Sequence, residues 1–323
     1  MGVNIEVVFP GRSRNRAKRV DPKLSTWYSP AWHLSSFCVD HNLRNLEEIM
    51  GLKPLISVCI PCYNGRKFIA ITLESVLRQT LGDFEVVVLD DKSSDETVSI
   101  IRTFSDSRIR LIQNDSNLGM GRNWNKALSC AHGKYVKLLC QDDILSPECL
   151  ARQAEVLENH SNSRVVLTIC NRLVIDERGE TVLRRRFPFG PGVVRGEKLI
   201  RRSIRCGSNL IGEPVVGLFR RGVLARTKMC DTSNPYLSDL SLWSELLKHG
   251  DAFIDQDYLA SFRLAEGAAT ASIGLRQAAY FRQFVRAVRS EAFYRVNLVD
   301  ASLAYLLSFQ WCVLRNIYSK LLC

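Results

Sequence analysis

Residues 135–143, YVKLLCQDD, place two adjacent carboxylates directly after a short, mostly apolar strand. The strand is expected over residues 135–139, and Asp142 and Asp143 follow its end. Two carboxylates at the edge of a core repel each other and lose solvation, which costs free energy unless a cation or a polar ligand compensates. This stretch therefore predicts a divalent metal ion bound at the end of the strand.

The composition suits an enzyme of ordinary size. The 323 residues are 46% hydrophobic and carry a net charge of +11, so the chain can bury a full core and favours anionic partners. Eleven cysteines without regular spacing indicate free thiols, and no apolar window is long enough to span a membrane. We therefore expect a cytoplasmic protein with a basic leader at residues 1–53, and peripheral contact with the inner face of a membrane stays open.

Strand-like and helix-like segments alternate on the N-terminal side of this stretch. Apolar strands are expected over residues 56–60, 84–89 and 109–112, and the segment 66–79 between the first two has helical periodicity. Polar residues follow each strand: Tyr63 and Asn64, then Asp90 and Asp91, then Asn117 and Gly119. Four strands joined by helices predict an open parallel sheet with right-handed crossovers, which binds ligands at the carboxyl ends of its strands.

Local signals predict where three helices begin or end. Ser93 and Glu96 match a capping box at a helix start. Gly133 is in a favourable place for a left-handed C-cap at the end of the next helix. Pro147 suits the first position of the helix that follows the two aspartates.

A further helix is expected in the second half of the chain, with Asp239 at its start and Gly250 at its end. Its apolar face is formed by Leu240, Trp243, Leu246 and Leu247. Judged from the residues alone, Asp239 is an N-cap or an acidic complement to the helix dipole.

Four segments, taken in order, resemble the nucleotide-binding half of family 2 glycosyltransferases with the GT-A fold. They are ISVCIPCYN (56–64), FEVVVLDDKSSDET (84–97), NLGMGRNWNKAL (117–128) and YVKLLCQDDIL (135–145). The resemblance implies a Rossmann-like, mostly parallel α/β sheet with helices on both faces. It also implies a nucleotide-sugar-binding half at residues 54–160, an acceptor-binding half at 161–272 and a C-terminal helical extension at 273–323.

The resemblance also suggests binding residues. From the resemblance, nucleotide-sugar contacts are expected at Pro61, Tyr63, Asn64, Asp90, Asp91 and Asp142. Asn117 and Gly119 are further candidate contacts because they follow a strand, and the charge of a leaving diphosphate calls for a cation such as Arg122 or Arg263. Asp142 and Asp143 fall on the metal-binding motif and are expected to hold Mg²⁺ or Mn²⁺. Cys140 stands where many members have an aspartate, and a thiol is a poor ligand for such hard cations.

The same resemblance changes the interpretation of Asp239. The family's Glu-Asp motif carries its catalytic base at this position, whereas Ser238 stands where the glutamate is common. An inverting enzyme is implied, in which Asp239 removes the acceptor proton while the nucleotide diphosphate leaves in one in-line step. The donor would be a UDP-, GDP- or dTDP-linked sugar, and the acceptor a glycan or a lipid-linked molecule.

Several alternatives remain open at this point. The two replacements at Cys140 and Ser238 also fit a catalytically silent nucleotide-sugar or glycan-binding module, and net charge alone would allow a nucleic-acid binder. Residues 59–62 match a C-x-x-C redox motif, although no second pair completes a zinc site.

Two further regions each allow two interpretations. The basic region 164–205, with a hairpin expected at 165–175 and 181–184, is a solvated face or a docking surface. The apolar helix expected at 301–314 packs on the domain or rests on a membrane.

Overall fold

The first four strands pair in parallel, as the alternating pattern predicts. In the computed structural model, which describes residues 53–264, 274 and 276–321, they lie in the order β3-β2-β1-β4. Their bounds are Ile56–Cys62 for β1, Phe84–Asp90 for β2, Ile109–Gln113 for β3 and Tyr135–Leu138 for β4. β1 and β2 are mostly apolar, apart from Ser57, Glu85 and Asp90, because parallel strands are covered on both faces. The basic leader expected at residues 1–53 lies outside the described residues except for Lys53.

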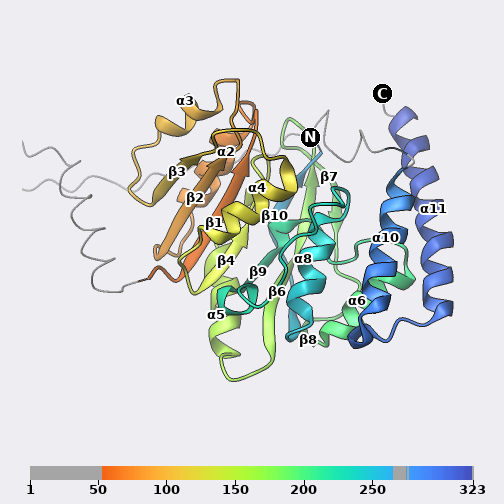
Figure 1. The fold of residues 1–323 in the computed structure, drawn as a ribbon. Coiled ribbons are helices and arrows are strands. Elements are labelled where there is room, and N and C mark those ends of the chain that lie inside the picture. Colours follow the sequence, from red (N-terminus) through yellow and green to blue (C-terminus); the bar gives the residue numbers. More distant parts are fainter. Residues whose placement is uncertain (1–52, 265–273, 275, 322–323) are drawn as a thin grey trace, which may run out of the picture. The chain divides into compact units, whose positions relative to one another are not determined.

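The second half of the chain extends the same sheet with mixed pairings (Figure 1). After β4 come β9 (Gly217–Arg220), β6 (Val165–Ile175), β10 (Asp251–Arg263) and β5 (Ile144–Leu145). β7 (Thr181–Arg185) pairs antiparallel with β6, and β8 (Gly192–Val194) pairs antiparallel with β10. The hairpin expected in the basic region is therefore confirmed, and the expected α/β fold class is confirmed with it.

Helices cover this sheet and extend the domain at one end. In the first half they are α2 (Ile69–Leu77), α3 (Thr97–Arg102), α4 (Met120–Ser129) and α5 (Cys149–Asn159). The second half contains α6 (Gly196–Arg205), α7 (Arg221–Leu224), α8 (Ser238–Leu247), α10 (Arg276–Ser290) and α11 (Leu298–Leu321), with short 3₁₀ turns at Pro214–Val216 and Ala292–Tyr294. Among the described helices, none combines the length and the apolarity needed to cross a membrane.

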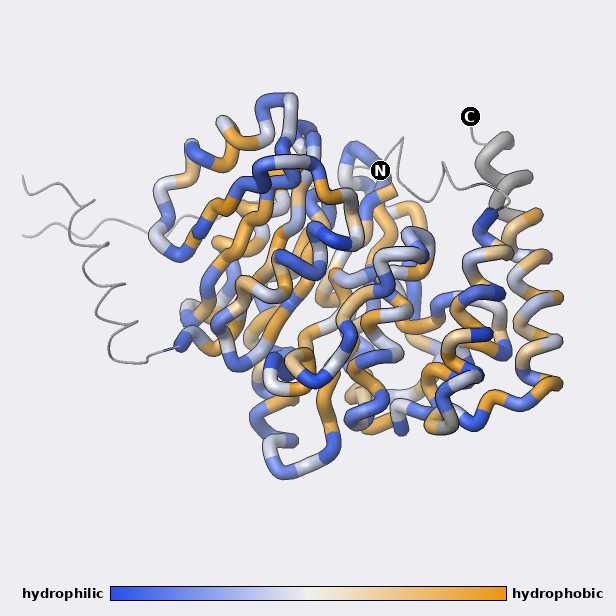
Figure 2. The backbone as a smooth tube through the Cα atoms, viewed as in Figure 1, coloured by the Kyte–Doolittle hydropathy of each residue, from blue (hydrophilic) through white to orange (hydrophobic). Residues whose placement is uncertain are grey.

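Hydropathy follows this arrangement closely. Figure 2 shows apolar residues along the central strands and polar residues in the loops that join them. The apolar face expected on α8 is buried, with Leu240, Trp243, Leu246 and Leu247 all inaccessible to solvent. Cys59 and Cys62 are also buried in β1, and burial raises the pKa of both thiols, so this pair is part of the core rather than a redox site.

The capping box predicted at Ser93 and Glu96 is wrong. α3 begins only at Thr97, and the Ser93 hydroxyl donates to the Asp90 carboxylate instead of capping the helix. Asp95 takes over part of the capping role, because its Oδ1 accepts from the Thr97 backbone N–H at 3.0 Å. A tertiary contact therefore outcompetes the local motif.

The predicted ends of three other helices also need correction. α4 ends at Ser129, so Gly133 is not its C-cap, and α5 begins at Cys149, two residues after Pro147. α8 ends at Leu247, and Gly250 is instead a point of close packing, where an added Cβ would lie 2.1 Å from the Arg164 carbonyl oxygen. Both glycines are needed for close approach between segments rather than for ending helices.

Gly133→Ala is expected to destabilise the domain by about 1–3 kcal/mol, the usual cost of overpacking a well-filled core. An added Cβ would lie 2.5 Å from the Ser57 backbone nitrogen and 2.7 Å from the Ile56 carbonyl carbon, both in the buried strand β1. Urea unfolding measures the effect. Gly82→Ala is the matched control, because nothing lies within 4 Å of its added Cβ. Equal midpoints for the two variants would contradict this view of the packing.

Candidate active site

The carboxylate of Asp91 organises the loop that precedes α4. Its Oδ1 accepts from the Leu118 backbone N–H at 2.8 Å, and its Oδ2 accepts from that of Gly119 at 2.9 Å. Gly119 has φ of 81°, a conformation that favours glycine, and the Asn117 side chain also accepts from its N–H at 3.0 Å. Asp91 therefore holds the polar ends of β2 and β3 together.

The neighbouring Asp90 joins the ends of β1 and β2. Its carboxylate accepts from the backbone N–H and the hydroxyl of Ser93, whose Oγ in turn accepts from the Asn64 backbone N–H at 2.9 Å. Asn64 has a positive φ of 49°, and its side-chain oxygen accepts from the Ser94 N–H at 2.9 Å. Pro61 is buried within β1, whereas Tyr63 is 46% exposed at the rim.

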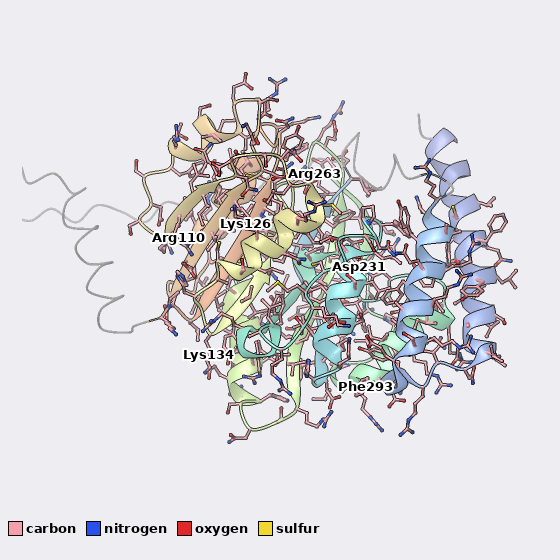
Figure 3. All side chains as sticks on the ribbon, in the orientation of Figure 1. Arg110, Lys126, Lys134, Asp231, Arg263 and Phe293 are labelled. Carbon is pink, nitrogen blue, oxygen red and sulfur yellow. The ribbon has the colours of Figure 1, made fainter. Side chains whose placement is uncertain are left out.

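Two asparagines that the sequence reasoning missed complete this region. Asn114 donates to Asp91 Oδ1 at 2.8 Å and to Asn123 Oδ1 at 3.0 Å, and it accepts from Lys126 Nζ at 2.6 Å (Lys126 is labelled on α4 in Figure 3). Asn123 donates to the Leu89 carbonyl at 3.2 Å. Both asparagines are buried, so their role depends on long-range contacts that the sequence pattern does not reveal.

Gln141 ties the end of β1 to the loop with the two aspartates. Its side-chain oxygen accepts from the Tyr63 backbone N–H at 2.8 Å, and its amide nitrogen donates to the Tyr63 carbonyl at 3.1 Å. The Gln141 carbonyl accepts from the Thr72 hydroxyl of α2 at 2.8 Å. The expected positions at the ends of β1 and β4 are therefore adjacent.

Asp142 and Asp143 differ in their surroundings. Asp143 is fully buried; its Oδ1 accepts from the Arg263 backbone N–H at 3.0 Å, and its Oδ2 has no hydrogen-bond partner. Burial raises the pKa of Asp143 well above its ordinary value, and the charge of Asp142 raises it further. Burial also raises the pKa of the Asp142 carboxyl. An unpartnered buried oxygen beside a second carboxylate is a donor arrangement that suits a hard divalent cation.

The protein itself supplies few ligands at this position. In the part of the chain that the structure describes, no group of three or more His, Cys, Asp or Glu side chains could hold a metal ion. A cation on Asp142 and Asp143 would therefore need oxygen ligands from a bound molecule and from water, which is how Mg²⁺ sites at phosphates are commonly built.

Arg263 does not present its charge to a ligand as the sequence analysis expected. Its side chain, labelled in Figure 3 at the end of β10, is 2% exposed, and its Nε donates to the Asp142 carbonyl at 2.9 Å. Its Nη1 donates to the Asp176 carbonyl at 2.8 Å, and its guanidinium lies 4.5 Å from the centre of the Phe68 ring. Arg263 thus clamps the aspartate loop onto the β6–β7 hairpin. Arg122, by contrast, is exposed in the first turn of α4.

Asp239 lies in the first turn of α8 and is oriented by two donors. Its Oδ1 accepts from the Leu240 backbone N–H at 2.6 Å, and its Oδ2 accepts from the Asn209 side chain at 2.8 Å. Burial, followed by the charge of Glu213, raises the pKa of Asp239 to about 7, although both hydrogen bonds and the charge of Arg172 lower it. A carboxylate with this pKa can exchange a proton near neutral pH.

The loop before β9 supplies the surroundings of Asp239. The Asn209 amide also donates to the Gly212 carbonyl at 3.1 Å, and its oxygen accepts from the Gly212 N–H at 3.0 Å. Gly212 has φ of 108°, and an added Cβ would lie 2.6 Å from Arg172 Nη1. The buried Arg172 forms an ion pair with Glu213. The backbone conformation of Gly212 therefore allows Asn209, Glu213 and Arg172 to meet around Asp239.

The Cys140 thiol lies close to two acidic regions, the pair Asp142 and Asp143 and the pair Asp239 and Glu213. Burial raises the pKa of its thiol, and the charges of Asp143, Asp142, Asp239 and Glu213 all raise it further. Glu213 also raises the pKa of Asp143. The aspartate loop and Asp239, almost one hundred residues apart in the chain, therefore lie within electrostatic range of each other. Cys140 is therefore a neutral thiol within electrostatic range of both acidic regions.

Solved structures share this architecture. TarS from S. aureus superposes with a TM-score of 0.59 at 20% identity, over 79% of this chain and 42% of the TarS chain. Its segment 1–349, solved in complex with UDP-GlcNAc, gives a TM-score of 0.55 at 21% identity, over 72% of this chain and 65% of that one. The mannosyltransferase PcManGT from Pyrobaculum calidifontis, in complex with GDP-Man and Mn²⁺, gives 0.56 at 18% identity, over 85% and 80% of the two chains. These similarities show the GT-A fold.

Sequence comparison adds the family. The Escherichia coli enzyme WfaP, a UDP-Glc:alpha-D-GlcNAc-diphosphoundecaprenol beta-1,3-glucosyltransferase, is 29% identical over 198 residues, which are 61% of this chain and 71% of WfaP. The model of glycosyl transferase family 2 matches residues 57–226, more than half of the 323 residues. The matched segment contains the ends of β1 to β4 and the aspartate loop. The chain therefore belongs to glycosyl transferase family 2 and is a glycosyltransferase.

Proposed function

We propose that this enzyme transfers a sugar from a nucleotide diphosphate donor to a hydroxyl of a glycan or lipid-linked acceptor, with inversion at the anomeric carbon. The observation that carries the proposal is the pair of acidic regions around Cys140, one suited to a cation and the other holding a carboxylate with a pKa of about 7. The proposal includes a cytoplasmic location. It also includes a nucleotide-sugar-binding half at residues 54–160, an acceptor-binding half at 161–272 and a C-terminal helical extension at 273–323.

The donor nucleotide is proposed to bind at the carboxyl ends of β1, β2 and β4. Tyr63 and Arg122 offer exposed side chains there, while Asp90, Asp91 and Asn64 hold the strand ends in place. Backbone groups at Pro61, Asn117 and Gly119 are further candidate contacts. The nucleotide sugars named with TarS, PcManGT and WfaP support this class of donor.

Asp142 and Asp143 are proposed to hold Mg²⁺ or Mn²⁺ against the donor diphosphate. When bound, such a cation would neutralise charge that develops on the leaving diphosphate. The unpartnered Asp143 Oδ2 and the Mn²⁺ named with PcManGT support this assignment. Arg263 keeps the two carboxylates in place from the protein side.

Asp239 is proposed to act as the general base. Its ionised carboxylate would accept the proton of the acceptor hydroxyl as that oxygen attacks the anomeric carbon from the side opposite the diphosphate. Asn209 and the Leu240 N–H fix the orientation of the carboxylate. Because the diphosphate leaves without a proton, the reaction needs only this one protein group for proton transfer.

Incubation with UDP-, GDP- and dTDP-linked sugars, Mn²⁺ and a panel of glycoside and lipid-diphosphate acceptors tests the function. Acceptor-dependent release of a nucleoside diphosphate is the expected result. Tight donor binding without turnover on any acceptor would instead favour a silent binding module.

Two neighbours of Asp239 are expected to move its pKa in opposite directions. Glu213→Gln removes a negative charge and lowers that pKa, so the rising limb of the pH–rate profile, expected near pH 7, moves to lower pH. Asn209→Ala removes a donor to the carboxylate and moves the limb to higher pH. The pH dependence of kcat/KM measures both shifts, and Glu74→Gln, in an exposed pair with Arg78, should cause none. Limbs that move in the same direction in both variants would contradict this role for Asp239.

A further inference from the structure

The helix α11 has an apolar side that nothing in the described structure covers. Val299, Leu303, Leu306 and Phe309 are 65%, 36%, 58% and 54% exposed, and their spacing of four, three and three residues places them along one side of the helix. The opposite side packs on the domain through Ala301, Ala304, Ser308 and Cys312. Figure 1 shows α11 at the end of the domain remote from β3. A continuous exposed stripe of this kind marks an interaction surface more often than scattered apolar residues do.

The stripe lacks the charges that a solvated helix face would carry. Residues 301–313 contain no Lys, Arg, Asp or Glu. In Figure 2 the outer side of α11 is correspondingly apolar over several turns. The polar residues on the exposed side of α11, such as Ser302 and Gln310, carry no charge. Exposure of the apolar stripe to water is therefore unfavourable.

A basic groove lies next to this stripe. Its lining along α6 includes five cations and one carboxylate: Arg195, Lys198, Arg201, Arg202, Arg205 and Glu197. Arg201 Nε lies 2.8 Å and Arg205 Nε 3.3 Å from the Asp300 carboxylate, which directly follows Val299 in α11. At the C-terminal end of α6, directly after Arg205, the Cys206 carbonyl accepts from Trp311 Nε1 at 3.1 Å. The groove and the stripe are therefore parts of one continuous surface.

The positions around α11 place the stripe beside the helix side that contacts α6. With about 100° between successive residues, Asp300 and Trp311 lie roughly 100–120° around the helix from Val299. Leu303 lies between these two residues and the centre of the stripe, so the stripe borders the contact with α6. Gly207 fixes the contact, since an added Cβ there would lie 2.4 Å from the Ser308 backbone nitrogen. Apolar side chains of α11 thus lie next to the groove of α6, in which Asp300 pairs with Arg201 and Arg205.

We infer that α11 and the basic groove of α6 form a docking surface for an anionic phospholipid bilayer. The apolar stripe would enter the interfacial region, and the groove cations would meet phosphate headgroups, the combination typical of helices that lie on membranes. A second copy of this chain fits less well, because its groove and its net charge of +11 would oppose an identical charge. The inference does not depend on the proposed donor, base or metal.

Vesicle co-sedimentation of the full chain tests this surface. We expect binding to phosphatidylcholine vesicles that contain about 30% phosphatidylglycerol, and little binding to pure phosphatidylcholine. Leu306→Ser with Phe309→Ser is expected to lower the partition coefficient by at least about tenfold, because two apolar side chains that would enter the bilayer are replaced by polar ones. The matched control is Val182→Ser with Leu183→Ser on β7, two residues of similar exposure away from α11, and it should bind as the unchanged protein does.

A second pair of variants tests the groove. Lys198→Ala with Arg202→Ala is expected to weaken binding to the anionic vesicles several-fold, whereas Arg184→Ala with Arg186→Ala on the exposed hairpin should have a smaller effect. Equal binding to neutral and anionic vesicles would overturn the inference, as would binding that the Leu306 and Phe309 changes leave intact. A third result would also overturn it: no vesicle binding, together with a dimer in analytical ultracentrifugation that the Leu306 and Phe309 changes dissociate.

Discussion

Asp239→Asn is expected to reduce the transfer rate by about 10²–10⁴-fold, the usual contribution of a general base, while donor binding changes little. The amide keeps the size of the carboxylate and can still accept from the Leu240 N–H, but it cannot take up the acceptor proton. A loss confined to kcat is therefore expected, because Asp239 acts on the acceptor hydroxyl and not on the nucleotide.

Steady-state kinetics with varied donor and acceptor measure this effect. Asp231→Asn is the matched control, since Asp231 is an exposed aspartate of the loop before α8 whose carboxylate accepts from the backbone N–H and the hydroxyl of Ser233. It should retain nearly full activity. Full transfer activity in Asp239→Asn would remove Asp239 from the mechanism.

Asp143→Asn is expected to weaken Mn²⁺-dependent donor binding by about 100-fold, at the upper end of effects seen when metal sites are perturbed. The amide oxygen can still accept from the Arg263 N–H, so the loop keeps its anchor while the negative charge is lost. Because no third His, Cys, Asp or Glu of the described residues joins these two carboxylates, removal of one leaves the cation with little support.

Titration calorimetry with UDP, GDP and dTDP, each with Mn²⁺ and then with a chelator, measures this loss. Asp257→Asn, in an exposed pair with Arg152, is the control and should bind as the unchanged protein does. Nucleotide affinity that is equal with and without Mn²⁺ in the unchanged protein would contradict a metal at Asp142 and Asp143.

The strands of the nucleotide-binding half were predictable because their environment is uniform. β1, β2 and β4 are covered on both faces, so apolar side chains occupy most of their positions and the polar residues at their ends stand out. Helix ends were not predictable in the same way. Ser93 has the sequence context of an N-cap, yet Asp90 and Asn64 take its hydroxyl, and only the tertiary structure decides between these partners.

The environment of Asp239 shows the same limit. Asn209 and Glu213 lie about thirty residues before it in the chain, and Arg172 lies further still, so no local pattern connects them. Arg263 was expected to meet a ligand because it is a cation near the right segment. Its 120-residue separation from Asp143 conceals that the two are hydrogen-bonded neighbours. The structure alone shows why position 212 requires glycine, through its positive φ and its close contact with Arg172.

A structure determined with donor and Mn²⁺ bound tests the central claim most directly. We expect the metal between the donor diphosphate and the carboxylates of Asp142 and Asp143, with the nucleotide against the ends of β1 and β2. The Asp239 carboxylate should face the anomeric carbon from the side opposite the diphosphate. A metal bound away from Asp142 and Asp143, or an Asp239 that lies on the diphosphate side of the sugar, would contradict the account.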